Sequence, residues 1–110
     1  MDGQTVQFGN CTTDFSIQSC GKPLQYAIAC EDIGYEKIHS YVGQEPSGVA
    51  FNAFSLNANR KPHNPLINSG AIIVSSMFQP DLNISKRFKY LTKKFSDLGM
   101  ILLQYFLCYK

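Results

Sequence analysis

A serine and a lysine stand three residues apart in the segment Ser19-Cys20-Gly21-Lys22. Residues i and i+3 share one face of a helix, so the lysine amine can reach the serine hydroxyl and accept its proton. The partial positive charge at a helix N-terminus and removal from water both favour an uncharged amine, the form that acts as a base. The spacing therefore predicts Ser19 as a nucleophile for acyl transfer, with backbone amides of the helix start holding the oxyanion.

The same four residues have a plainer interpretation. A serine helix cap followed by an exposed lysine gives the same spacing, and so short a motif also arises by chance. The helix that would carry the pair is expected from Ser19 to Ile33, with Ser19 at its N-cap. Pro23 falls in the first turn, where it removes no intrahelical hydrogen bond, and Gly34 ends the apolar pattern.

The remaining segments are expected to support this helix. Their predicted types follow from apolar spacing and from the turn residues between them. They are an extended stretch at 1–17, a short helix at 35–42, a long loop at 49–67, a helix at 68–78 opened by Asn68, and a helix from Ile84 with an apolar stripe at Phe88, Leu91, Phe95, Leu98 and Leu102.

Composition narrows the class of protein. With 110 residues, the chain is one domain or part of one, and with 45% apolar and 16% charged residues it is expected to fold. The apolar runs are too short to cross a membrane, and the chain shows no leader or transit pattern.

Six of the ten basic residues follow position 85. We read them as the solvated face of a helix rather than as a contact for nucleic acid or lipid. The four cysteines have no zinc-site spacing and are expected to be free thiols.

Several segments in order carry a resemblance to a known family. They are Phe15 to Ala29, Tyr41 to Gly48, Phe51-Asn52 and Lys61 to Ile72, with Asp2-Gly3-Gln4 at the start. Together they resemble the glutaminase family, the serine-dependent glutamine amidohydrolases, and most of all the animal kidney and liver types. The resemblance runs from about Asp2 to about Leu98. It divides the chain into residues 1–98, the N-terminal part of a glutaminase domain, and residues 99–110, a divergent apolar tail.

The resemblance implies an α+β fold, part of the β-lactamase and penicillin-binding-protein type, mostly helical in this chain. It implies that Ser19 is the nucleophile and also contacts substrate, that Lys22 is its base, and that Asn68 binds L-glutamine. Ser19 would attack the side-chain amide, ammonia would leave, and water would release glutamate. No metal and no organic cofactor is implied. His63 and Asn64 are interpreted as residues that order the loop.

The resemblance also sets the expected limits of this activity. A tyrosine that the family carries before the serine, and further substrate ligands that it carries later, have no counterpart in the 110 residues. We therefore expect little or no glutamine hydrolysis by this chain alone. The resemblance also implies homo-oligomers and, for the animal enzymes, a mitochondrial location. Two alternative functions stay open. One is a non-catalytic form that binds or modulates full-length subunits, and the other is a penicillin-binding type of serine enzyme that β-lactams would label.

Overall fold

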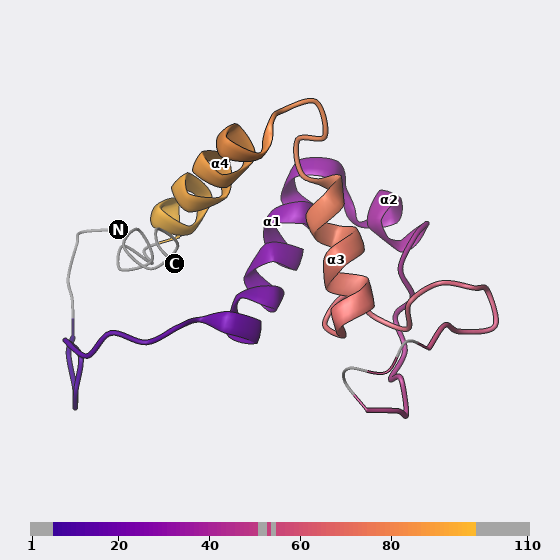
Figure 1. Ribbon diagram of the computed structural model, residues 1–110, viewed down its shortest axis with the longest axis horizontal. Coiled ribbons are helices and arrows are strands. Elements are labelled where there is room, and N and C mark those ends of the chain that lie inside the picture. Colours follow the sequence, from indigo (N-terminus) through magenta and orange to yellow (C-terminus); the bar gives the residue numbers. More distant parts are fainter. Residues whose placement is uncertain (1–5, 51–52, 54, 99–110) are drawn as a thin grey trace.

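The computed structural model describes residues 6–50, 53 and 55–98. They form a short 3-10 turn, η1 (Gln18–Gly21), and four α-helices: α1 (Lys22–Ile33), α2 (Tyr35–His39), α3 (Asn68–Met77) and α4 (Ile84–Asp97). Helix α1 lies at the centre, because it contacts each of the other three. Helices α1 and α3 run side by side in the same direction, whereas α4 runs back the opposite way (Figure 1).

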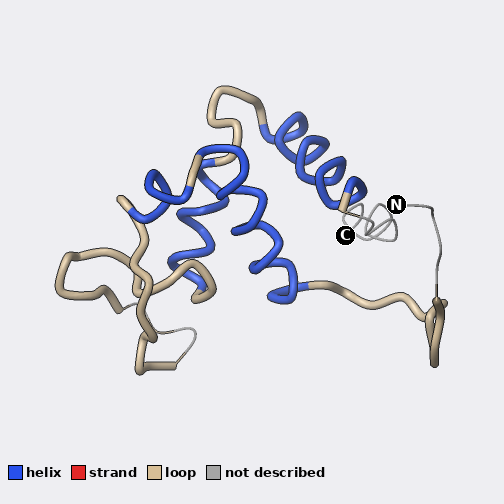
Figure 2. Tube along the Cα trace, turned by 180° about the vertical axis from the view of Figure 1, so that it is seen from behind, coloured by secondary structure: helices blue, strands red, loops and turns tan. Residues whose placement is uncertain are grey.

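The described part of the chain is mostly helical, as predicted. It contains no strand, and its only β-type pairing is an isolated antiparallel bridge between Leu56 and Pro62 (Figure 2). Residues 6–17, expected to be extended, are loop. The antiparallel sheet of the expected α+β fold is therefore not among the described residues. The Asp2-Gly3-Gln4 segment and the tail at 99–110 lie outside them.

The start of α1 differs from the prediction. Ser19 does not cap the helix: it lies inside η1, and α1 begins at Lys22 with Gly21 at its N-cap and no side-chain cap. The 3-10 turn takes over the capping function, since the Lys22 amide donates to the Ser19 carbonyl. Pro23 does occupy the first turn of α1, and Gly34, with φ of 84°, follows its last residue as predicted.

The other helices match their predicted positions with small shifts. Helix α3 ends one residue before the predicted 78, and α4 starts at Ile84 as expected, where the Asn83 side chain accepts from the Lys86 amide. Helix α2 is shorter than predicted and ends at His39. The chain turns there because the Ser40 hydroxyl donates to the Lys37 carbonyl and the Gly43 amide pairs with the Pro62 carbonyl.

The hydrophobic core joins all four helices. Its members are buried side chains from every helix and from the segment ends that follow α2 and α3: Ile28, Ala29, Ile38, Val42, Val74, Phe78 and Phe95. The apolar stripe predicted along α4 is only partly covered. Phe95 is buried and Leu91 packs against the core, but Leu98 is 55% exposed. The apolar contacts among α1, α2 and α3 therefore stabilise the arrangement of the site-bearing helices more than the contacts of α4 do.

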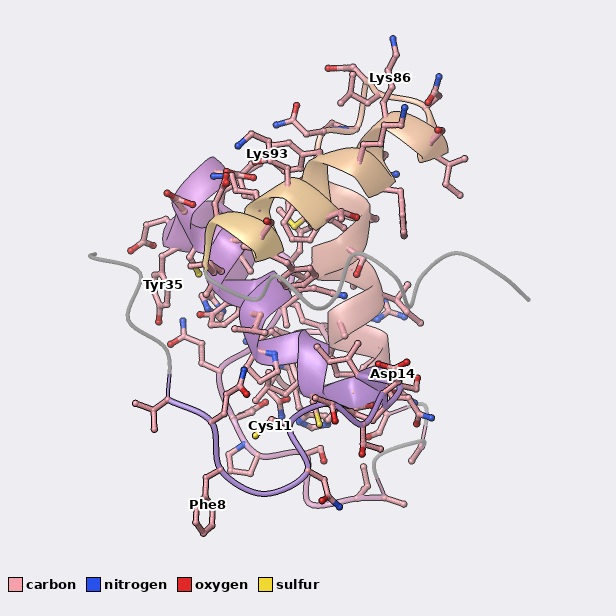
Figure 3. The ribbon with its side chains drawn as sticks, turned by 90° about the vertical axis from the view of Figure 1, so that its left-hand side faces the viewer. Phe8, Cys11, Asp14, Tyr35, Lys86 and Lys93 are labelled. Carbon is pink, nitrogen blue, oxygen red and sulfur yellow. The ribbon has the colours of Figure 1, made fainter. Side chains whose placement is uncertain are left out.

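A polar network attaches α4 to the end of α1. Lys94 Nζ lies 2.8 Å from Glu31 Oε2 and 3.2 Å from Asp32 Oδ1, and the Tyr90 hydroxyl donates to Asp32. The opposite face of α4 is charged and solvated, and Lys86 extends away from the other helices there (Figure 3). The solvated-face interpretation is confirmed for Lys86, Lys89 and Lys93, whereas Lys94 pairs with α1 and Arg87 donates to the Ser75 carbonyl of α3. Lys110 lies outside the described residues. No helix in the described residues is both long and apolar enough to span a bilayer.

Candidate active site

Two of the three residues singled out from the sequence are in direct contact. Lys22 Nζ donates a hydrogen bond of 2.5 Å to Asn68 Oδ1, across 46 positions of the chain. Each residue is the first of its helix, Lys22 in α1 and Asn68 in α3. The amide oxygen of Asn68 is thus engaged by lysine, which leaves its Nδ2 group as a donor for another molecule.

Ser19 lies one helical turn before Lys22, on the exposed side of η1. The Lys22 amide donates to the Ser19 carbonyl, which fixes the two residues on consecutive turns. No side-chain hydrogen bond joins the Ser19 hydroxyl to Lys22 within residues 6–50, 53 and 55–98. The structure therefore brings Lys22 and Asn68 together and places Ser19 one turn before Lys22, with its side chain exposed.

The parallel packing of α1 and α3 puts both helix starts at the same end of the molecule (Figure 1). A second polar contact along the same face, from the Ser75 hydroxyl to Gln25 Oε1 at 3.1 Å, keeps the helices in this register. The aligned peptide dipoles give each helix N-terminus a partial positive charge. Two such ends beside the Lys22 amine form a region suited to a carboxylate or to an oxyanion.

Small residues allow the close packing at this end. A side chain at Gly70 would place its Cβ 1.9 Å from the Asn64 carbonyl oxygen, so only glycine fits there. Gly70 therefore lets the first turn of α3 pack directly against the loop backbone. Gly43 is equally restricted, since its Cβ would lie 2.6 Å from the His63 carbonyl oxygen.

His63 and Asn64 hold the long loop in place, as predicted from the sequence. Asn64 Oδ1 accepts from the amides of Leu66 and Ile67 at 3.0 and 3.1 Å, and its Nδ2 donates to the Glu45 carbonyl at 2.9 Å. His63 Nδ1 lies 3.4 Å from Glu45 Oε1, within ion-pair distance but without hydrogen-bond geometry.

A half-buried histidine network beside the site was not anticipated from the sequence. His39 Nδ1 donates to the Val42 carbonyl at 2.9 Å, so in the neutral ring Nε2 accepts from the Tyr26 hydroxyl at 2.7 Å. Burial, followed by the neighbouring Cys30 thiol, raises the pKa of Tyr26 to about 12. Tyr26, Tyr35 and His39 line a cavity of about 220 Å³. No spacing pattern links Tyr26 to His39, because their contact depends on the angle between α1 and α2.

Comparison with known proteins identifies the class of this chain. The family model for glutaminase matches residues 1–101. A Caenorhabditis elegans protein is 46% identical over 104 residues, covering 92% of this chain and 18% of that protein. The rat protein "Glutaminase liver isoform, mitochondrial" is 44% identical over 99 residues, covering 90% and 16%. A glutaminase of Corynebacterium glutamicum is 34% identical over 100 residues, covering 90% and 24%.

The chain belongs to the glutaminase family. It spans about a sixth of the length of the animal relatives that it matches. Ser19, Lys22 and Asn68 all fall within the matched region.

Proposed function

We propose that this chain carries the nucleophile, the base and one substrate ligand of a serine-dependent glutaminase site. The observation that carries the proposal is the 2.5 Å hydrogen bond between Lys22 Nζ and Asn68 Oδ1. It places a lysine and an amide side chain, drawn from two distant segments, beside the turn that presents the Ser19 hydroxyl. Family membership supports L-glutamine as the substrate, with no metal or organic cofactor in the proposed reaction.

The proposed reaction has two acyl-transfer steps. An uncharged Lys22 amine has two N–H groups and one lone pair. Donation of one N–H to Asn68 leaves the lone pair to take the proton of Ser19. Ser19 Oγ then adds to the side-chain amide carbon of glutamine, and the C–N bond breaks as the nitrogen takes a proton and leaves as ammonia. Water adds to the ester, and glutamate leaves with restoration of the Ser19 hydroxyl.

Asn68 has a second task in this proposal. Its Nδ2 group, which is not used by Lys22, is placed to donate to the α-carboxylate of glutamine. The partial positive charges of the α1 and α3 starts would attract the same carboxylate. The amide would thus link the orientation of the base to the binding of the substrate.

We further propose that the 110 residues alone hydrolyse glutamine weakly or not at all. Ser19 and Asn68 are both exposed. Neither the cavity beside Tyr26 nor the groove between α1 and α4 is lined by Ser19, Lys22 or Asn68. Acyl transfer depends on positioned donors and on exclusion of water from the reacting atoms, and the described residues provide little of either. The remainder of a β-lactamase-like α+β fold would supply this enclosure.

Two measurements test the proposal. Ammonia release from L-glutamine by the purified chain is expected to be far below that of a full-length relative, and turnover at a comparable rate would contradict the proposed weakness. In the full-length rat relative, alanine at the positions that match Ser19 and Lys22 should lower turnover at least about a hundredfold. Unchanged turnover in either variant would contradict the assigned roles. The position that matches the exposed Lys37 serves as the control.

A second candidate function is binding to full-length glutaminase subunits. Exposed apolar side chains favour it: Phe8 is 97% exposed and projects from the N-terminal segment (Figure 3), and Ile72 on α3 is 69% exposed. Co-purification with a full-length subunit would support this function, and a monomer that binds no such subunit would contradict it. By analogy with the rat relative we propose a mitochondrial location, which cell fractionation tests.

A further inference from the structure

The start of α3 is held by one side chain that makes three hydrogen bonds to two separate segments. Asn64 Oδ1 accepts from the backbone amides of Leu66 and Ile67, the two residues directly before α3. Its Nδ2 group donates to the carbonyl of Glu45, in the turn that follows α2. Asn64 thus ties the first turn of α3 to a segment that is not part of α3.

The backbone of Asn64 completes this attachment. Its carbonyl oxygen lies so close to Gly70 that a Cβ there would approach to 1.9 Å. The Glu45 amide also donates to the His63 carbonyl at 3.0 Å, next to Asn64 in the chain. The first turn of α3 is therefore fixed from both sides, by bonds to the residues before it and by contact with Gly70 inside it.

The residue that this attachment places is Asn68. Its Oδ1 must meet Lys22 Nζ at 2.5 Å, on a helix that belongs to a different part of the chain. A hydrogen bond is lost when its atoms separate by a further ångström, so a small rotation of the first turn of α3 would break this contact. Ala71 and Val74 are buried one and two turns further along α3, so the position of Asn68 at the very start of the helix depends on the contacts made just before it.

We propose that Asn64 is a positioning residue of the glutaminase site, which sets the first turn of α3 so that Asn68 holds the Lys22 amine. The inference rests on the proposed function for its catalytic meaning. It gives the Lys61-Pro62-His63-Asn64-Pro65 segment a role beyond ordering its own loop. Gly70 is required for the same arrangement, because any larger residue at this position would force α3 away from Asn64.

The chain offers a matched control for this role. Asn57 lies in the same loop, and its Oδ1 also accepts two backbone bonds, from Asn59 and Lys61, each of 3.0 Å. Asn57, like Asn64, accepts two hydrogen bonds from backbone amides just after it, but among the described residues it makes no hydrogen bond to the residues that begin α3. A residue that only orders the loop should therefore behave like Asn57.

The test measures whether Lys22 and Asn68 remain in contact, and it does not require catalysis. The side-chain amide signals of Asn68 are recorded by nitrogen-15 NMR on the full chain, with and without Lys22→Met. We expect Lys22→Met to shift these signals in the parent chain and in Asn57→Ala, and to leave them unshifted in Asn64→Ala. A shift of equal size in Asn64→Ala would overturn the proposal.

Two further variants keep the test decisive if Asn64→Ala fails to fold. Asn64→Asp retains the acceptor for both backbone amides, and we expect it to preserve most of the shift. Gly70→Ala favours helix formation but drives a Cβ into the Asn64 carbonyl, and we expect it to abolish the shift in a folded chain. Persistence of the full shift in Gly70→Ala would overturn the proposal as surely as persistence in Asn64→Ala.

Addition of L-glutamine to the same samples separates this inference from the proposed function. If glutamine moves the Asn68 signals in the parent chain and not in Asn64→Ala, both are supported. If glutamine moves no signal while the Lys22 effect still follows Asn64, glutamine binding by this chain is wrong and the positioning role of Asn64 stands.

Discussion

Lys22 and Asn68 are the first residues of two parallel helices, and their side chains meet at 2.5 Å. This contact joins a base candidate to a substrate-ligand candidate. The Nδ2 group of Asn68 stays available as a donor, which suits a carboxylate, and Oδ1 keeps a second lone pair that can accept another hydrogen bond.

Substitution of Asn68 should weaken glutamine binding in a way that depends on charge. Asn68→Ala removes the Nδ2 donor, and loss of a hydrogen bond to a charged group costs about 1.5–3 kcal/mol, or roughly a 10- to 100-fold weaker affinity. Asn68→Asp should be worse, because a carboxylate repels the α-carboxylate and holds the lysine amine charged. The affinity is measured by titration of the chain with L-glutamine. Asn59→Ala, in an exposed turn, is the control, and equal affinity in Asn68→Ala would contradict the ligand role.

Ser69→Ala should stabilise the chain. The Ser69 hydroxyl is buried and has no hydrogen-bond partner among the described residues. A buried polar group without a partner is costly, and alanine also has the higher helix propensity in α3. We expect the free energy of unfolding to rise by about 1 kcal/mol, measured by urea unfolding followed by circular dichroism. Ser76→Ala, at an exposed position of the same helix, is the control. A lower free energy of unfolding in Ser69→Ala would show that the hydroxyl has a partner.

The helices could be predicted from the sequence because their ends carry local signals. Pro23 and Gly34 mark α1, and apolar spacing marks α3 and α4, so the predicted bounds were right to within a few residues. The cap assigned to Ser19 was wrong, because a 3-10 turn satisfies the helix start through the backbone. Serine favours both a cap and a tight turn, and local sequence does not separate the two.

The site could be predicted only in its parts. Ser19 and Lys22 are close in sequence, so helical spacing alone suggested their proximity. The contact of Lys22 with Asn68 depends on the packing of α1 against α3 and on the close approach of α3 to the Asn64 backbone, which Gly70 permits. No sequence pattern within a single segment predicts the contact between the two helices. The network of Tyr26 and His39 escaped prediction for the same reason.

Lys94 and Lys93 are neighbours on α4 with different expected effects on stability. Lys94 pairs with Glu31 and Asp32 of α1, and its side chain is 27% exposed, whereas Lys93 pairs with Asp97 of its own helix and is 75% exposed. Lys94→Met should lower the urea midpoint and loosen α4, because it leaves two carboxylates without their cation. Lys93→Met should leave the midpoint almost unchanged, since exposed pairs within a helix contribute little. Amide hydrogen exchange along α4 checks this difference, and equal protection in both variants would contradict it.

Stability should fall in alkaline solution through groups that hold their protons more tightly in the folded chain. Burial raises the pKa of Tyr26 to about 12 and also raises the pKa of Tyr90, and the bond to Glu31 raises the pKa of Lys94. The unfolded chain releases these protons first, near pH 10, so folding binds protons there. The resulting stabilisation is present in full below about pH 10 and is lost as the pH rises through the folded values. Urea midpoints measured from pH 8 to pH 12 should therefore be steady at first and then decline.

Tyr26→Phe isolates one part of this alkaline decline. It removes the titrating hydroxyl, so the loss of stability between about pH 10 and pH 12 should become shallower, although the variant loses the hydrogen bond to His39 at every pH. Tyr41→Phe, which removes an exposed tyrosine hydroxyl, is the control and should keep the parent slope. If Tyr26→Phe and the parent chain lose stability with the same slope, Tyr26 does not hold its proton more tightly in the folded state. The decline would then come from the network at Tyr90 and Lys94, where the same titration of Lys94→Met would reveal it.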